Sequence, residues 1–335
     1  MADLPLVVLT NRTFPETRAM FEGRAHVVAN DGIEPWPRAR LLEEVRKASG
    51  LMAFMTEQID AEFLEACPEL RIIGAALKGY DNIDVEAARQ RGVMVTIVPD
   101  LLTEPTAELA IGLAIALGRR VLEGDALVRG GDFAGWRPRL YGRGLHGSTV
   151  GILGFGKVGQ VIARQLEGFG CRILASDLSP VAAVATSVEF ATPEHLLEVS
   201  DFVFLALPLA DATVGMIGAS ELARMKPGAF LINPARGSLV DESAVADALE
   251  AGRLGGYAAD VFAFEDWARD DRPLRIDQRL SQPGARTVLT PHIGSATVSA
   301  RRMIEAAAAR SIVQGLAGEI PDGLVTPLEQ LGKTC

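Results

Sequence analysis

The sequence lacks the features that mark several other classes of protein. It has only three cysteines, Cys67, Cys171 and Cys335, which lie far apart and form no CxxC pair or metal-ligand spacing. Its formal net charge is -10, whereas a nucleic-acid-binding protein needs a basic surplus. It contains neither an apolar run long enough to cross a membrane nor a signal-peptide pattern at its start. These absences predict a cytoplasmic protein with reduced thiols, no metal site, and neither nucleic acid nor a membrane as a partner.

What the sequence does contain is an alternation of short apolar runs with helical patterns over nearly all of its 335 residues. This alternation is typical of βα units, and the length suits two domains. We therefore expect an α/β fold with two Rossmann-like or flavodoxin-like parallel-sheet domains. A long apolar helix is expected from about Pro105 to Gly130, followed by an exposed arm that reaches Ser148. The expected strands are Leu6–Thr10, Leu51–Met55, Ile72–Leu77, Met94–Val98, Thr149–Leu153, Ile173–Ser176, Phe202–Leu207, Phe230–Asn233, Tyr257–Val261 and Thr287–Leu289.

A glycine-rich segment opens the second series of βα units. Gly154, Gly156 and Gly159 form the pattern GxGxxG between an apolar strand and an amphipathic helix. In a dinucleotide-binding fold the first glycine permits a tight turn, the second lets the pyrophosphate approach the backbone, and the third brings helix and strand close. The phosphates then lie on N–H groups at the start of the helix. The pattern alone is common, but this context favours a dinucleotide site over a plain βα turn.

Asp177 ends the next βα strand, eighteen residues after Gly159. A dinucleotide fold places at this position the acid that binds the hydroxyls of the adenine ribose. A carboxylate there repels a 2′-phosphate, and the two residues that follow carry no positive charge. The sequence therefore predicts NAD rather than NADP as the cofactor, against the alternative of an exposed turn aspartate.

Three polar residues follow later strands, where open α/β sheets bind their ligands. Arg236 can form two hydrogen bonds with an oxyanion, and His292 can move a proton near neutral pH. Glu265, if it lies near His292, would hold the tautomer of the imidazole and favour its protonated form. Each residue alone also fits a surface turn or a solvated loop. Together they predict a catalytic set that acts on a small anion.

At this point the chain resembles the D-isomer-specific 2-hydroxyacid dehydrogenase family over nearly its whole length. In that family the arginine binds substrate, the histidine is the acid/base and the glutamate supports the histidine, which implies these roles for Arg236, His292 and Glu265. The segments that carry the resemblance are LKGYDNID (Leu77–Asp84), PTAELAIGLAIAL (Pro105–Leu117), NPARGSLVDE (Asn233–Glu242), GGYAADVF (Gly255–Phe262) with Glu265, and TPHIGSAT (Thr290–Thr297).

The resemblance also implies how the domains are arranged in the sequence. Residues 1–100 and 292–335 are expected to form the substrate-binding domain, and residues 101–291 an inserted NAD-binding domain. The long helix and the arm, at about residues 105–148, are expected to form a homodimer.

Three departures from the broad family pattern resemble its phosphonate dehydrogenase branch. Lys78 adds a second cation beside Arg236, and the segment after Glu265 does not read Glu-Pro. Bulky side chains in 52–55 and 135–141 flank the expected cleft, as though the substrate were small. The branch implies NAD-dependent oxidation of phosphite to phosphate, in which His292 is a base toward water or orients phosphite. The alternative for Lys78 is a lysine that points from the turn to solvent.

Two other functions remain open for this sequence. One is a 2-hydroxyacid dehydrogenase that reduces glyoxylate or hydroxypyruvate, and the other is an NAD-sensing protein of the corepressor type. The predicted substrate-binding residues are Met55, Lys78, Gly79, Arg236 and Arg301. The predicted cofactor-binding residues are Lys78, Thr106, Gly154, Phe155, Gly156, Lys157, Val158, Gly159, Asp177, Pro208, Ala235, Asp260, His292 and Gly294.

Overall fold

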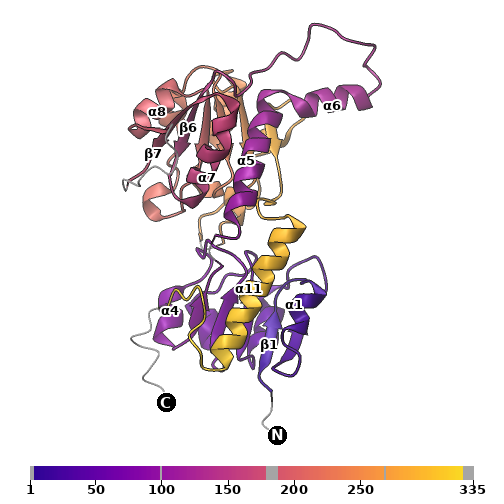
Figure 1. The fold of residues 1–335 in the computed structure, drawn as a ribbon, viewed down its shortest axis with the longest axis vertical. Coiled ribbons are helices and arrows are strands. Elements are labelled where there is room, and N and C mark those ends of the chain that lie inside the picture. The colour runs from indigo at the N-terminus through magenta and orange to yellow at the C-terminus, as the bar shows by residue number, and fades with distance from the viewer. Residues whose placement is uncertain (1–3, 99, 179–187, 268, 327–335) are drawn as a thin grey trace. The chain divides into compact units, whose positions relative to one another are not determined.

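The computed structural model describes residues 4–98, 100–178, 188–267 and 269–326, and the chain divides into two compact units. Unit 1 consists of Met1–Leu102, Trp267–Asp270 and Ala296–Cys335, and unit 2 of Thr103–Asp266 and Asp271–Ser295. Unit 1 is thus built from both ends of the sequence, and most of unit 2 is inserted between them (Figure 1). The expected fold class, α/β with an inserted dinucleotide-binding domain, is confirmed.

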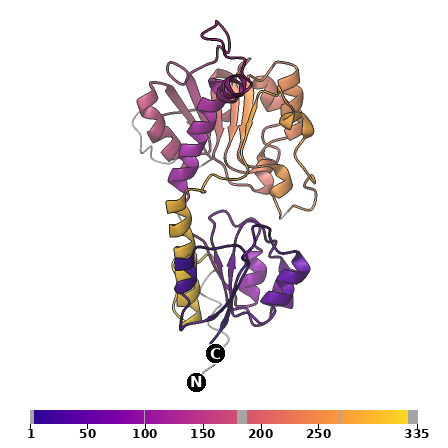
Figure 2. The ribbon, with the colours of Figure 1, turned by 90° about the vertical axis from the view of Figure 1, so that its right-hand side faces the viewer.

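Unit 1 contains a five-stranded sheet in the order β2-β1-β3-β4-β5, and its strands pair in parallel. The long helix α11 packs against β3 and β4, and Figure 2 shows it along one side of the sheet. Gly74 lets this helix approach closely, since a Cβ atom there would come within 2.5 Å of Ile312. The elements of unit 1 are β1 (Leu6–Leu9), α1 (Pro15–Ala19), β2 (His26–Ala29), α2 (Arg38–Val45), β3 (Gly50–Ala53), α3 (Ala61–Ala66), β4 (Ile72–Ala75), α4 (Val85–Gln90), β5 (Met94–Thr96) and α11 (Val298–Leu316).

Unit 2 contains a seven-stranded parallel sheet in the order β12-β11-β10-β9-β6-β7-β8. Because its strands run parallel, their carboxyl ends lie at one edge, where the loops that follow them gather. Its elements are α5 (Thr103–Gly118), α6 (Val121–Arg129), β6 (Thr149–Leu153), α7 (Lys157–Leu166), β7 (Arg172–Ser176), β8 (Val188–Phe190), α8 (Pro193–Val199), β9 (Phe202–Leu205), α9 (Ala219–Arg224), β10 (Phe230–Asn233), α10 (Glu242–Glu250), β11 (Gly256–Ala259) and β12 (Thr287–Leu289).

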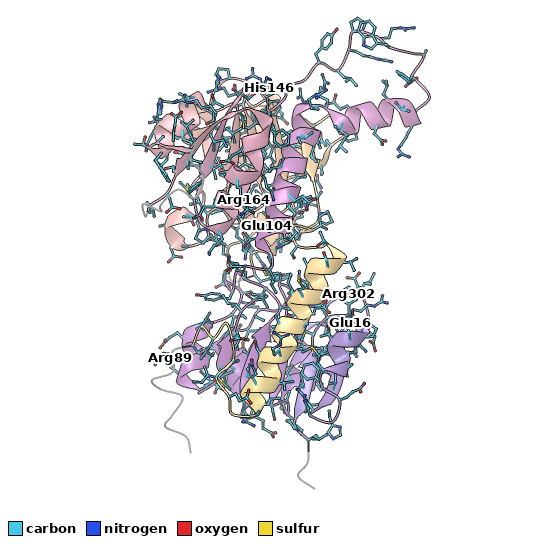
Figure 3. The ribbon with its side chains drawn as sticks, viewed as in Figure 1. Glu16, Arg89, Glu104, His146, Arg164 and Arg302 are labelled. Carbon is cyan, nitrogen blue, oxygen red and sulfur yellow. The ribbon has the colours of Figure 1, made fainter. Side chains whose placement is uncertain are left out.

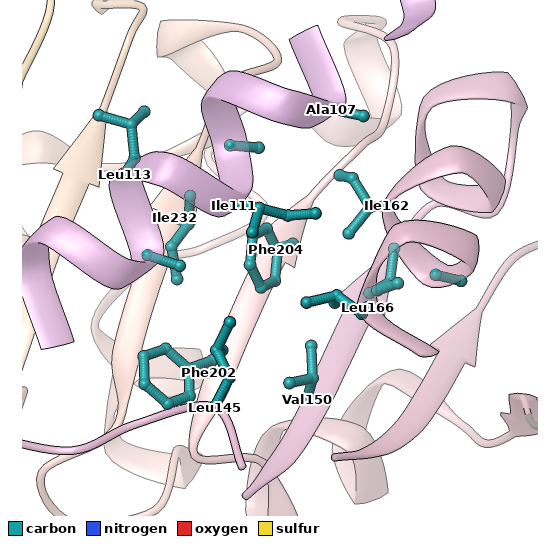
Figure 4. Close-up of a cluster of buried hydrophobic side chains, with 14 of the residues drawn as sticks. Ala107, Ile111, Leu113, Leu145, Val150, Ile162, Leu166, Phe202, Phe204 and Ile232 are labelled. Carbon is teal, nitrogen blue, oxygen red and sulfur yellow. The ribbon is translucent and has the colours of Figure 1, made fainter. Parts of the chain in front are cut away.

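One face of the unit 2 sheet is covered by α5 and α7. Figure 4 shows Ile111 of α5 and Ile162 of α7 above Phe202 and Phe204 of β9. These side chains belong to a buried apolar cluster, and an ion pair between Arg164 and Glu104 joins the same two helices at the surface (Figure 3). The cluster fixes α7, and with it the glycine-rich loop that precedes α7.

The structure corrects two details of the expected element pattern. The helix expected from Pro105 to Gly130 is two helices, because Arg120 adopts a left-handed conformation, with φ of 55°, between α5 and α6. Two strands were not expected, β2 and β8, and both lie at sheet edges. Edge strands are short and partly exposed, so their apolar pattern is weak. Among the described residues, no helix is both long and apolar enough to span a membrane.

Candidate active site

The glycine-rich loop joins β6 to α7 at the carboxyl edge of the unit 2 sheet. Gly154 has φ of +91°, and a Cβ atom there would come within 2.6 Å of the Ala206 carbonyl oxygen. A Cβ atom at Gly159 would come within 2.2 Å of the Gly154 carbonyl oxygen. Both positions therefore require glycine, the first for its backbone conformation and the second for the close approach of helix and strand.

Gly156 differs from its two neighbours in the pattern, because a Cβ atom there would meet open space. It is the N-cap of α7, and no side chain among the described residues caps the helix start. Lys157 and Val158 form the first turn, so their N–H groups and the positive end of the helix dipole face this space. An uncapped helix start beside an open glycine fits a pyrophosphate.

Asp177 follows β7, the strand next to β6. Its carboxylate accepts a hydrogen bond of 2.6 Å from the backbone N–H of Phe155, so it lies directly beside the glycine-rich loop. Phe155 itself is fully buried, and its side chain belongs to the apolar core beneath the loop. The geometry therefore fits a ribose whose hydroxyls donate to Asp177 while the adjoining phosphates lie on α7.

His292 and Glu265 form a close pair in unit 2. Nδ1 of His292 lies 2.9 Å from Oε2 of Glu265, while Oε1 of Glu265 accepts the Phe262 N–H at 2.7 Å. The two side chains are 31% and 21% exposed, so the outer nitrogen of the imidazole remains accessible to a small molecule. The Glu265 carboxylate accepts a hydrogen bond from Nδ1–H, which leaves Nε2 to give or take a proton.

Asp260 holds the turn that carries His292. It is 1% exposed, and its carboxylate accepts hydrogen bonds from Thr290 Oγ1 and from the N–H groups of Ile293 and Gly294, at 2.6–2.8 Å. Burial raises the pKa of Asp260 above its usual value. His292 itself adopts φ of 54°, a left-handed conformation that is costly for a side chain of this size. The Asp260 hydrogen bonds offset that cost.

Arg236 lies in the loop after β10, the strand beside β11. Its main chain is fixed by Asn233, which is fully buried and donates from Nδ2 to the Arg236 carbonyl oxygen at 2.8 Å. The Asn233 amide oxygen also accepts the Ala235 N–H at 3.1 Å. The sequence did not single out Asn233. An asparagine at the last position of a buried strand is the signal that could have identified it.

Three other predicted cofactor-binding residues also lie at the carboxyl edge of unit 2. Pro208 is exposed in the loop after β9, and Ala235 is partly buried in the loop after β10. Thr106 is on the first turns of α5 and lies beside Gly294. A Cβ atom at Gly294 would come within 3.3 Å of Oγ1 of Thr106. The structure thus brings these residues to the edge that carries Asp177, Arg236, Asp260 and His292.

The remaining predicted residues belong to unit 1. Met55 follows β3, and Lys78 and Gly79 follow β4, so all three lie at the carboxyl edge of that sheet. Nζ of Lys78 lies 3.2 Å from the carboxylate of Asp100, a pair with both side chains partly exposed. An exposed pair of this kind contributes at most about 1 kcal/mol, so Lys78 can exchange Asp100 for an anionic ligand.

Glu57, which the sequence did not single out, ties the loops of this edge together. It is 4% exposed, and its carboxylate accepts hydrogen bonds from the Phe54 N–H at 2.6 Å and from Asn11 at 3.2 Å. Asn82 donates to the carbonyl oxygens of Phe54 and Glu57 at 3.0 and 2.7 Å. Burial raises the pKa of Glu57. The loop that carries Met55 is therefore fixed by the buried Glu57 and Asn82 and by the partly buried Asn11.

Arg301 lies near the start of α11 and is held on two sides. Its guanidinium lies 5.5 Å from the centre of the Phe54 ring and 3.7 Å from the carboxylate of Glu305, and burial lowers its pKa. Glu305 in turn accepts the Phe14 N–H at 2.9 Å. The neighbouring Arg302 instead points to α1, where it pairs with Glu16 at 2.7 Å (Figure 3).

The chain is similar to known proteins over most of its length. Residues 111–294 match the family model described as D-isomer specific 2-hydroxyacid dehydrogenase, NAD binding domain. Glyoxylate reductase of Thermococcus litoralis is 42% identical over 296 residues, which is 86% of this chain and 87% of that protein. Glyoxylate reductase of Pyrococcus furiosus is 40% identical over 323 residues, 92% and 94% of the two chains. The crystal structure of a glyoxylate reductase from Paecilomyes thermophila is 26% identical, with a TM-score of 0.83 over 97% and 99% of the two chains.

The family model covers more than half of this chain. The two archaeal glyoxylate reductases are at least 40% identical to it over at least 86% of its length. The segment that the model matches carries the glycine-rich loop, Asp177, Arg236, Glu265 and His292. The protein therefore contains an NAD-binding domain, is an NAD(P)-dependent oxidoreductase, and belongs to the D-isomer specific 2-hydroxyacid dehydrogenase family.

Proposed function

We propose that the protein reduces a small 2-oxo acid, glyoxylate or a close analogue, to the 2-hydroxy acid with NADH. The observation that carries this proposal is the His292–Glu265 pair at the sheet edge that also carries the glycine-rich loop. The names of the curated relatives support glyoxylate as the substrate, and they favour it over phosphite.

The chemistry that follows needs one anion-binding group and one proton donor. When bound, the nicotinamide supplies the hydride that forms the new C–H bond at the carbonyl carbon. Arg236 forms paired hydrogen bonds with the substrate carboxylate and fixes its orientation. Protonated His292 donates a proton to the carbonyl oxygen, which becomes the hydroxyl, and Glu265 stabilises the imidazolium before transfer. In the oxidation direction His292 accepts the same proton.

We further propose NAD in preference to NADP. The Asp177 carboxylate lies beside the glycine-rich loop through its bond with Phe155, where it can accept from ribose hydroxyls but would repel a 2′-phosphate.

Phosphite oxidation is the second candidate, and Lys78 is the residue that favours it. A dianion gains more than a monocarboxylate from a second cation, and Lys78 pairs weakly with the partly exposed Asp100. His292 would take a proton from water as the water oxygen bonds to phosphorus. Bound NAD⁺ would accept the hydrogen of the P–H bond as a hydride, so that the products would be phosphate, NADH and a proton.

One assay separates these functions. The purified protein is mixed with NADH and glyoxylate, then with NAD and phosphite, and NADH absorbance is followed. Turnover of glyoxylate is expected under the main proposal, and turnover of phosphite alone would replace it with the second candidate. If phosphite is turned over, Lys78→Ala should reduce that rate. Inactivity toward both substrates would favour the NAD-sensing alternative.

We also propose that unit 1 contributes the substrate-binding residues Met55, Lys78, Gly79 and Arg301, that unit 2 binds NAD and contributes Arg236 and His292, and that two chains associate through α6 and the arm after it. None of the residues of α6 is buried, and Figure 1 shows α6 and the arm extending away from the sheet of unit 2. Trp136 and Tyr141 on the arm are 77% and 74% exposed, which is typical of residues that a partner covers. Light scattering should give twice the chain mass, and deletion of residues 131–144 should give a monomer.

A further inference from the structure

Two loops of unit 2 carry Arg236, the proposed substrate-binding group, and Glu265, the partner of the proposed proton donor His292. The Arg236 loop comprises residues 234–239, and the Glu265 loop comprises residues 262–266. They follow β10 and β11, which are neighbouring strands, and each contains a short 3-10 turn. The relative position of Arg236 and Glu265 therefore depends on what joins these two loops.

Asp266, directly after Glu265, forms one of these joints. It is 3% exposed, and its Oδ2 accepts a hydrogen bond of 2.7 Å from the backbone N–H of Ser238 in the Arg236 loop. A carboxylate that accepts a main-chain N–H in a buried site forms a short, charge-assisted bond, which is stronger than a neutral one. Asp266, the neighbour of Glu265, is thus bonded to Ser238, two residues after Arg236.

Main-chain packing leaves this link little freedom. A Cβ atom at Gly237 would come within 1.8 Å of the Phe262 carbonyl carbon and within 2.1 Å of the Ala263 nitrogen. The two loops are therefore in direct backbone contact, and neither can shift without moving the other. The proposed reaction does not use the Asp266 carboxylate. Its contact with Ser238 therefore points to a structural role, in which it holds the two loops together.

A second buried carboxylate supports the same joint from α10. Oε1 of Glu242 accepts the Ala263 N–H at 2.9 Å, and burial raises the pKa of Glu242. Glu265 itself accepts the Phe262 N–H with one oxygen and contacts His292 with the other. The position of Glu265, and through it that of His292, is thus set by a short loop whose two ends are anchored.

We propose that Asp266 is a positioning residue that fixes Glu265 relative to Arg236 and so holds Glu265 against His292. The inference rests on the proposed roles of Arg236 and His292. Loss of the Asp266–Ser238 bond lets the Glu265 loop move, which lengthens the distance between Glu265 and His292. The imidazolium then loses part of its stabilisation, and Arg236 no longer holds substrate in the reactive orientation.

The test compares Asp266→Ala and Asp266→Asn with the wild-type enzyme, using the substrate that the assay above identifies. If that substrate is glyoxylate, the reaction needs a proton donor, and the rate is expected to fall as pH rises. Asp266→Ala should move this limb to lower pH and reduce kcat/KM by about 10- to 100-fold, the scale of a 1 Å misplacement. Asp266→Asn should recover most of the loss, because its amide oxygen can still accept the Ser238 N–H. With phosphite, where His292 acts as a base, the rising limb should move to lower pH.

Asp201→Asn is the matched control. Asp201 is also buried, and it accepts the Thr149 N–H at 3.0 Å, but at the start of β6, away from the carboxyl edge. It should lower the melting temperature without moving the pH limb. If Asp266→Ala does not fold, Asp266→Glu takes its place, since it keeps the charge and displaces it by one methylene.

Two results would overturn the proposal: an unshifted pH limb in the folded Ala or Glu variant, or a loss of rate no larger than that of Asp201→Asn. His292→Asn, assayed in parallel, separates this failure from that of the proposed function. If His292→Asn retains the rate and the limb, the assigned role of His292 is wrong. If it removes activity while the Asp266 variants behave as wild type, the positioning role alone is wrong.

Discussion

The two units use buried carboxylates at the carboxyl edges of their sheets in different ways. In unit 1, Glu57 accepts from the Phe54 N–H and from Asn11, and it holds main chain around Met55. In unit 2, Asp260 holds the turn of His292, while Glu265 contacts the imidazole directly. Glu57 fixes a loop, whereas Asp260 and Glu265 also fix the imidazole of His292.

This difference shows where each unit tolerates change. A loop that only shapes a surface can move slightly and still bind an anion, because long cations such as Lys78 and Arg301 can adjust. A proton donor must lie within hydrogen-bond distance of the atom it protonates. We therefore expect substitutions at the edge of unit 2 to affect catalysis more than equivalent substitutions in unit 1, and the predictions below test this expectation.

The largest effect is expected at His292. His292→Asn should reduce kcat/KM by about 10²- to 10⁴-fold, because the proton donor is lost, while asparagine still accepts the left-handed backbone conformation. The dissociation constant for NADH, measured by fluorescence titration, should stay within about twofold of wild type. A rate close to wild type would show that the imidazole is not the acid/base.

The next effect is expected at Asp260, and it combines stability with activity. Asp260→Asn replaces one acceptor oxygen with an NH₂ group that faces backbone N–H donors, which should cost about 2–3 kcal/mol. The melting temperature, measured by scanning calorimetry, should fall by about 5–10 °C. kcat/KM should also fall, because the turn of His292 loses its anchor. An unchanged melting temperature would contradict the anchoring role.

A smaller effect is expected at Asp177, which lies at the same edge but takes no part in proton transfer. Asp177→Ala should weaken NADH binding by about tenfold, the equivalent of about 1.4 kcal/mol. The ratio of the affinities for NADH and NADPH should also fall, because the 2′-phosphate of NADPH is no longer repelled. kcat at saturating NADH should change little. Titration with both cofactors measures the two affinities, and equal losses for both would rule out ribose recognition by Asp177.

The smallest effect at neutral pH is expected in unit 1, at Glu57. Burial raises the pKa of Glu57 above the usual 4.5. Its contribution to stability is therefore fully present below pH 4.5 and is lost as pH rises through the folded-state value. The difference in free energy of unfolding between wild type and Glu57→Gln should be largest in acid and should shrink toward neutral pH, to about 1 kcal/mol or less. Urea unfolding from pH 4 to 8 measures it, and a difference that grows with pH would have the wrong sign.

The site residues of unit 2 were easier to predict from the sequence than those of unit 1, because they stand at fixed positions after the strands. Gly154, Asp177, Asp260 and His292 each follow a strand, and parallel strands bring such positions to one edge. In unit 1, Glu57 meets Asn11, and Glu305 meets Phe14, residues 46 and 291 positions apart in sequence. No periodicity or spacing indicates such pairs, since they form only when distant segments pack. The same limit applies to Asp266 and Ser238.

The discontinuity of unit 1 has a consequence for how the chain folds during synthesis. α11 packs against β3 and β4, but it is made only after unit 2 has been completed. Chains grow at about 5–20 residues per second, so the early sheet waits on the order of ten seconds or more with one face lacking its cover. Unit 2 forms one nearly continuous stretch and can fold during that interval. Once folded, it shortens the loop that α11 must close to reach Ile72 and Gly74. The inserted domain would then speed the completion of the domain that it interrupts.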